Sequence, residues 1–128
     1  METLAAARAA HFDAASGACD YAALQASAEL ARVAACLAEL EAFDLQRVAI
    51  PAQTAFWLNV FNAVVLRDSA ELAGAASMRA ASAFFERPRL KVGAFEYSLD
   101  DIEHGLLRGN LPKFGARRAP MQRDDPRL

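Results

Sequence analysis

Residues 51–66, PAQTAFWLNVFNAVVL, constrain the fold more than any other part of the chain. On a helix of 3.6 residues per turn, their apolar side chains occupy almost the whole circumference. A helix that is apolar all round is either buried or spans a membrane. This segment is shorter than the roughly 20 apolar residues that a bilayer requires, and Asn59 and Asn62 interrupt it. It is therefore predicted to be the buried central helix of a protein core, with no membrane as partner.

Composition limits the classes of function that this chain can have. Its 128 residues, 55% hydrophobic and 23% charged, are enough for one globular domain with one core. A formal net charge of −2 gives no long-range attraction to nucleic acid. The two cysteines have no histidine at ligand spacing, so neither a zinc site nor another metal site is predicted. No signal-peptide pattern, phosphate loop or dinucleotide motif is present, so a cytoplasmic protein without a cofactor is expected.

The remaining pattern predicts a mainly α (α+β) fold, with about five helices around the central helix and one small β-hairpin. Asp20, Ser27, Ser77 and Ser98 precede helical patterns as N-caps, and Ser98 with Asp101 has the form of a capping box. The predicted helices cover residues 1–12, 20–26, 28–43, 51–66, 78–86 and 99–108. The hairpin is predicted over 89–98, because apolar residues alternate on both sides of Gly93-Ala94.

Two asparagines on the central helix are the first candidate site residues. Asn59 and Asn62 are three residues apart and share one helix face. A buried amide without partners costs on the order of 1–3 kcal/mol, so both are expected to be hydrogen-bonded. One interpretation is that they tie the central helix to a neighbouring segment. The other is that the amide pair lines a cleft.

Glu103 is the second candidate. A 3.6-residue period places it among the apolar residues of the last helix, on the side that faces the core, and places His104 on the opposite side with Asp100 and Arg108. A carboxylate on an inward face must be paired, hydrogen-bonded or protonated. Glu103 is thus either a structural anchor directed at Asn59, Asn62 or Arg67, or a candidate general base.

His104 is the third candidate, at i+4 from Asp100 and i−4 from Arg108. Asp100 could orient the imidazole, although pairs at this spacing are common on exposed helices. Ser98, Asp100 and His104 are the residue types of a catalytic triad, but they lie on one helix where Ser98 is needed as a cap. A Ser-His-Asp site is therefore rejected.

Two of these segments carry a family resemblance. AFWLNVFNAVVL and FEYSLDDIEHGLLRGN resemble the best-marked segments of the domain of unknown function 547 (DUF547) family, and DYAALQAS resembles its opening segment. The resemblance runs from about residue 19 to residue 110. It implies an N-terminal helical extension over 1–18, an incomplete DUF547-like domain over 19–110 and an irregular tail over 111–128. Family members usually continue into a strand with histidine and a segment ending in Cys-Pro, which the resemblance places after Leu128.

The resemblance carries no assigned chemistry, so two functions are considered. The first is an accessory or interaction module with no activity of its own. The second is the N-terminal half of a hydrolase-like or thiol-dependent enzyme domain, with Glu103, His104 and the asparagines lining a cleft that later residues complete. The resemblance also implies partners, because some relatives are fused to DEP or glutaredoxin-like domains.

Overall fold

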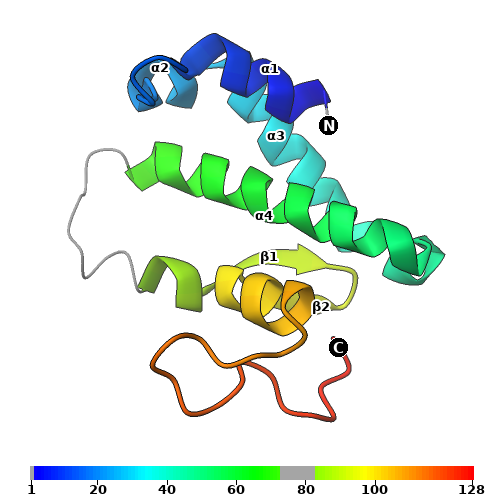
Figure 1. Ribbon diagram of the computed structural model, residues 1–128. Coiled ribbons are helices and arrows are strands. Elements are labelled where there is room, and N and C mark those ends of the chain that lie inside the picture. Colours follow the sequence, from blue (N-terminus) through cyan, green and yellow to red (C-terminus); the bar gives the residue numbers. More distant parts are fainter. Residues whose placement is uncertain (1, 73–82) are drawn as a thin grey trace.

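The protein consists of three layers with a long helix in the middle. The computed structural model describes residues 2–72 and 83–128. One layer contains α1 (Glu2–His11), α2 (Tyr21–Gln25) and α3 (Ala28–Glu39), and the middle layer is α4 (Ile50–Leu72). The third layer contains a helical turn at 83–86, a β-hairpin, the helical segment η3 (Asp101–Leu107) and the C-terminal segment (Figure 1). The predicted mainly helical fold with one hairpin is confirmed.

The helices of the first layer begin where their capping residues predict. Asp20 Oδ1 accepts a hydrogen bond from Ala23 N at 3.0 Å, and Ser27 Oγ accepts one from Leu30 N at 3.1 Å. Each cap satisfies a backbone N–H that the first helical turn leaves unpaired. Between α3 and α4 the chain forms two short 3-10 turns, η1 (Leu40–Ala42) and η2 (Leu45–Arg47), where the sequence predicts the end of a helix and a linker.

The central helix is longer and less buried than predicted. Helix α4 continues to Leu72, because Asp68 is buried and paired instead of ending the helix. Its core-facing side is apolar, but Ile50, at the start of the helix, and Leu58 are exposed. The expectation that α4 is covered all round is therefore wrong, and its exposed apolar residues contribute to the surface.

The hairpin matches its prediction. Strands β1 (Pro88–Val92) and β2 (Phe95–Ser98) pair antiparallel across Gly93-Ala94, with Val92 opposite Phe95. Gly93 has a positive φ of 56°, which a two-residue hairpin turn favours. Its N–H donates to the carbonyl of Leu40 at 2.9 Å, which anchors the turn against η1. The hairpin is thus held by the helical layers, as a lone hairpin must be.

Two apolar clusters hold the layers together. The larger lies between α3, α4, the hairpin and η3, and includes Trp57, Val64, Tyr97, Leu99 and Ile102. The smaller joins α1, α2, α3 and α4 through Ala7, Leu24, Leu30 and Ala70.

The predicted helix over 78–86 lies mostly outside the described residues, and its last turn, 83–86, is helical. Residues 111–128 contain no helix or strand, as predicted, yet Met121 is buried in the larger cluster. Within the described ranges, no helix has the length and apolar character needed to cross a membrane.

Candidate functional site

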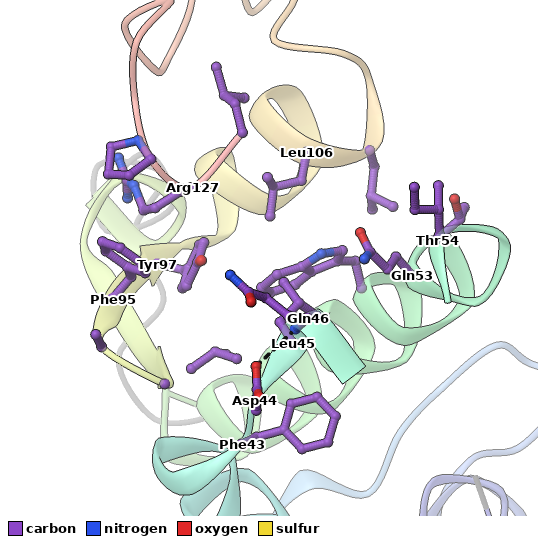
Figure 2. A pocket seen from close by; sticks show the side chains of 18 residues that line it. Phe43, Asp44, Leu45, Gln46, Gln53, Thr54, Phe95, Tyr97, Leu106 and Arg127 are labelled. Atoms are coloured by element: carbon purple, nitrogen blue, oxygen red, sulfur yellow. Dashed lines mark hydrogen bonds between the residues drawn. The ribbon is translucent and has the colours of Figure 1, made fainter. Parts of the chain in front are cut away.

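A cleft of about 540 Å³ opens between the stretch from Phe43 to the first turns of α4, the hairpin, η3 and the C-terminal residues. Figure 2 shows Tyr97 and Leu106 on one side of this space and Gln46, Gln53 and Thr54 on the other. Because four segments distant in the sequence contribute, the cleft depends on the complete packing of the third layer against α4. Its lining residues are Phe43, Asp44, Leu45, Gln46, Ile50, Gln53, Thr54, Trp57, Val92, Gly93, Ala94, Phe95, Tyr97, Leu106, Leu107, Pro126, Arg127 and Leu128.

Aromatic rings form the floor of the cleft, where Phe43, Trp57 and Tyr97 line it and belong to a row that also includes Phe56. Phe43 stacks on Phe56 with ring centroids 5.1 Å apart, Phe56 meets Trp57 edge-on at 5.1 Å, and Trp57 contacts Tyr97 at 4.9 Å. Such pairs contribute about 0.5–1.5 kcal/mol beyond the area that they bury. The row therefore joins the residue after η1 to α4 and β2.

Amide side chains supply the polar groups at the cleft's other wall. Gln53 Nε2 donates to the carbonyl of Val48 at 3.1 Å, which holds this side chain against the turn before α4. Asp44 Oδ1 accepts a hydrogen bond from Gln46 N at 3.1 Å, so its carboxylate caps the start of η2 (Figure 2). The Gln46 side chain is exposed. Together they give an apolar cleft a small number of hydrogen-bonding groups, as is usual for binding sites.

Arg127 closes the cleft beside the hairpin. Its guanidinium binds both oxygens of Asp125, at 2.9 and 2.8 Å, and one oxygen of Asp101 at 3.1 Å. It also donates to the carbonyl of Glu96 at 2.9 Å and lies over the Tyr97 ring, 5.6 Å from its centroid. The hydrogen bonds to Asp125 are the main reason why the pKa of Arg127 is raised. Arg127 thus fixes the C-terminal segment to β2 and to the start of the last helix.

The start of the last helix is the predicted capping box. Ser98 Oγ accepts from Asp101 N at 3.0 Å, and Asp101 Oδ2 accepts from Ser98 N at 3.0 Å. Ser98 is buried and fully used as a cap, in agreement with the rejection of a Ser-His-Asp site.

The predicted orientation of Glu103 and His104 is wrong. His104 is buried, with 8% of its side chain exposed, whereas the Glu103 side chain is 39% exposed. The reason is that η3 is a π-helix: the N–H of Arg108 bonds to the carbonyl of Glu103, five residues earlier, at 3.0 Å. A π-helix has more residues per turn than the 3.6 used for the prediction, so the side-chain directions shift along the segment.

The structure still brings the two catalytic candidates together. Glu103 Oε1 lies 3.8 Å from His104 Nε2 and 3.6 Å from Arg108 Nη1, while Arg108 Nη1 is 3.5 Å from His104 Nδ1. The first two distances are longer than a hydrogen bond, and the contact with His104 is ionic only when the imidazole is protonated. The expected anchoring of Glu103 to Asn59, Asn62 or Arg67 is not found, because its partners are on its own helix.

Asp100 does not orient His104. Its carboxylate accepts a hydrogen bond from Lys113 Nζ at 2.9 Å, and this bond is the main reason why the pKa of Lys113 is raised. Asp100, His104 and Lys113 line a small pocket of about 210 Å³ with Glu86, Ala116, Arg118 and Pro120. Neither this pocket nor any other group of described His, Cys, Asp and Glu side chains has the arrangement of a metal site.

Asn59 and Asn62 are not buried amides. Asn62 is exposed and Asn59 is half-buried, with its Nδ2 donating to the carbonyl of Ala55 in the same helix at 2.7 Å. The expectation of burial fails because the other layers cover only part of the surface of α4. Both asparagines line a second groove, between α1 and α4, at the opposite side of α4 from η3. The amide pair therefore lies apart from Glu103 and His104.

Sequence reasoning missed Asp68, the most buried acid described. It is 2% exposed, and its oxygens lie 2.6 Å from Arg67 Nε and 3.6 Å from Arg89 Nε. Arg67 also donates to the carbonyl of Arg89 at 2.9 Å, which ties α4 to β1. The available signal is an acid on the apolar side of a helix that is longer than the predicted range 51–66.

Comparison with known proteins identifies the family. The family profile described as "Protein of unknown function, DUF547" matches residues 45–128, about two thirds of the chain. The chain belongs to the DUF547 family. The match covers η2, α4, the hairpin, η3 and the C-terminal segment, so every wall of the cleft except Phe43 and Asp44 lies within it. No curated protein and no solved structure matches the chain.

The residue range of the family profile differs from the range of 19–110 that the sequence resemblance implies. It begins at residue 45 and includes residues 111–128, which the resemblance left outside the domain. Burial of Met121 and the contacts of Arg127 give a physical reason for including this segment, because both residues hold it against the domain.

Proposed function

We propose that this DUF547 domain is an interaction module that binds an extended, apolar peptide segment in the cleft of Figure 2 and has no activity of its own. The observation that carries the proposal is the position of β2 beside the aromatic floor. The sheet has two strands, so one edge of β2 lacks a strand partner within the described residues. At this edge the carbonyl of Glu96 accepts a hydrogen bond from the Arg127 side chain. Extended peptides bind such edges through main-chain hydrogen bonds and insert alternate side chains into neighbouring pockets.

The exposed residues around the cleft favour an apolar ligand. Ile50 is 81% exposed, Leu128 is 53% exposed and Phe95 is 39% exposed, and all three line the cleft. Apolar side chains that gather at a concave surface are typical of interaction sites, whereas isolated ones need no explanation. The charged groups nearby are already paired, since Arg127 is bound by Asp125 and Asp101. Affinity for this ligand would therefore come from apolar burial and main-chain hydrogen bonds.

The hydrolase-like or thiol-dependent alternative is favoured by one observation, the contact of Glu103 with buried His104. Such a pair can serve as a general base when a nucleophile lies beside it. The described residues that line the adjacent pocket include no serine, threonine or cysteine. Its lysine, Lys113, is held in the charged form by Asp100, which raises its pKa and makes it a poor nucleophile. The interaction module therefore has more support.

The test begins with selection of peptides from a displayed random library on the full chain. Binding is then measured with synthetic peptides by fluorescence, because Trp57 is the chain's single tryptophan and lines the cleft. Ile50→Glu places a charge at the cleft rim and is expected to weaken selected peptides at least about tenfold, equivalent to about 1.4 kcal/mol. Ile50 is the first residue of α4, where an acid is compatible with the helix dipole.

Leu58→Glu is the matched control. Leu58 lies on the same helix, is 48% exposed and does not line the cleft. Peptide affinity should be unchanged in this variant. The proposal fails if selection yields no binder of extended apolar sequence, or if Ile50→Glu and Leu58→Glu bind the selected peptides equally well.

A further inference from the structure

A second groove, about 450 Å³ in volume, separates α1 from the middle of α4. Helix α1 packs on α3 in the first layer (Figure 1). Four of its residues, Leu4, Ala5, Ala7 and Arg8, line the groove. Most of the groove is apolar, and its polar members are Arg8, Asn59, Asn62 and the thiol of Cys19. The lining residues are Leu4, Ala5, Ala7, Arg8, Phe12, Cys19, Leu24, Asn59, Asn62 and Leu66. We call it the α1–α4 groove.

The charge in this groove is of one sign. Arg8 lines it, and none of the other lining residues is acidic. Across residues 2–72 and 83–128, no carboxylate lies within ionic distance of Arg8, whose guanidinium instead lies 5.9 Å from the centroid of the Phe12 ring. A cation that borders an apolar groove without an acidic partner favours an anionic ligand, and a guanidinium is well suited to a carboxylate.

The two asparagines add neutral hydrogen-bonding groups. The Asn59 amide already donates to Ala55, so its oxygen remains as an acceptor, while the exposed Asn62 amide has both donor and acceptor available to a ligand. Burial, with a smaller contribution from the nearby carboxylate of Asp20, raises the pKa of the Cys19 thiol, so the thiol itself stays neutral. The groove therefore combines an apolar trough with one cation and two amides, the composition of a site for a small amphipathic acid.

We propose that the α1–α4 groove binds an apolar carboxylate of the medium-chain fatty acid class. The hydrocarbon chain would lie against Leu4 and Leu66, and the carboxylate would bind Arg8. A volume of about 450 Å³ is in the range of small-molecule sites. One wall of the groove, α1, precedes the family match that begins at residue 45, so this site combines the N-terminal helices with the DUF547 domain. The proposal is independent of the peptide cleft, which lies on the other side of α4.

The two cysteines provide the measurement. Cys19 lines the groove, whereas Cys36 is exposed on α3 and does not line it. The full chain is treated with a maleimide, with and without decanoate, and the labelling rate of each cysteine is followed by mass spectrometry. Decanoate should slow labelling of Cys19 several-fold and leave Cys36 unchanged. Decanol, which has the same chain without the charge, should protect Cys19 much less.

Two variants test whether the charge of Arg8 binds the carboxylate. Arg8→Gln should weaken protection by decanoate about tenfold or more, the loss expected for one charge-assisted contact, and should leave decanol unaffected. Arg32→Gln is the matched control, because Arg32 is an exposed arginine on α3 that is already paired with Glu29 at 2.7 Å. Circular dichroism of both variants checks that α1 remains folded.

Four results would overturn the proposal. Decanoate and decanol could protect Cys19 equally, or Arg8→Gln and Arg32→Gln could behave alike; either result removes the role of the charge. Cys19 could also become protected without ligand as protein concentration rises, which would mean that a second copy of the chain covers the groove. Protection of Cys36 in parallel with Cys19 would show general adsorption of the acid.

Discussion

Replacement of Asp68 by asparagine tests how α4 is joined to the hairpin. Asp68 is 2% exposed and lies between Arg67 on its own helix and Arg89 on β1. Asparagine has nearly the same shape, so the substitution creates no cavity and removes mainly the charge. It leaves two guanidinium groups, 21% and 27% exposed, without their carboxylate.

The magnitude follows from these contacts. Removal of one partner of a buried ion pair typically costs about 3–5 kcal/mol. The asparagine oxygen can still accept from Arg67, which returns about 1 kcal/mol for a neutral hydrogen bond. Both arginines also have some access to water, which lowers the penalty for leaving them unpaired. We therefore expect Asp68→Asn to reduce the free energy of unfolding by about 2–3 kcal/mol.

Urea denaturation followed by Trp57 fluorescence measures this loss. With a urea dependence of about 1–3 kcal/mol per molar, the midpoint should fall by about 1–2 M. Glu41→Gln is the control, because Glu41 is 63% exposed and lies 4.0 Å from Lys91 Nζ on β1. A surface pair of this kind contributes at most about 1 kcal/mol. Equal midpoints for the two variants would refute the reasoning, because Asp68 would then have no special role between α4 and β1.

Three further predictions concern the third layer. Asp101→Ala should lower the free energy of unfolding, measured by urea denaturation, by about 2 kcal/mol, because it removes a helix cap and a hydrogen-bond partner of Arg127. Glu103→Ala should lower it by less than about 1 kcal/mol. A reversed order would contradict the observed orientation of the π-helix. Gly93→Ala should lower the free energy of unfolding by about 1–2 kcal/mol, because residue 93 has a φ of 56° and its Cβ would lie 3.1 Å from the carbonyl oxygen of Phe43. An unchanged melting temperature would show that the turn relaxes freely. Burial raises the pKa of Tyr97, so this tyrosine loses its proton at a lower pH in the unfolded chain than in the folded protein, and stability should fall as the pH rises above the ordinary tyrosine pKa. Tyrosinate absorbance of Tyr97 in the folded protein should therefore appear only at a higher pH than for an ordinary tyrosine. Ionisation at the ordinary tyrosine pKa would contradict this.

Local features of the fold could be predicted from sequence because their partners are close in the chain. The caps Asp20 and Ser27 act on N–H groups three residues later, and the capping box of Ser98 and Asp101 has the same spacing. The hairpin turn is likewise decided by two residues. Interactions within a few residues are specified by the sequence pattern alone, which explains why these elements begin where they were expected.

The end of α4 could not be predicted in this way. A polar pair, Asp68-Ser69, normally weakens a helix, yet α4 continues to Leu72. The reason is Arg89, which is 21 residues later on a strand and places its Nε 3.6 Å from the second oxygen of Asp68. Tertiary contacts of this kind override local propensity and leave no signal in the segment itself.

The candidate site was predicted only in part for a similar reason. The sequence selected Glu103 and His104, and the structure places them in contact, but their exposure is opposite to that expected. The error lies in the helical period, because the segment that carries them is a π-helix. The peptide cleft was not anticipated, since its walls come from four segments that the sequence does not connect.

Asp101 takes part both in a local interaction and in a contact between distant segments of the chain. Its carboxylate closes the capping box, a local interaction, and the same oxygen binds Arg127, 26 residues away. Arg127 in turn holds the carbonyl of Glu96 at the outer edge of β2. A peptide that adds to this edge would compete with Arg127 for that carbonyl, because the guanidinium already occupies the space where the peptide's N–H would lie. Peptide binding in the cleft should therefore displace the Arg127 side chain and leave the capping box of Asp101 intact.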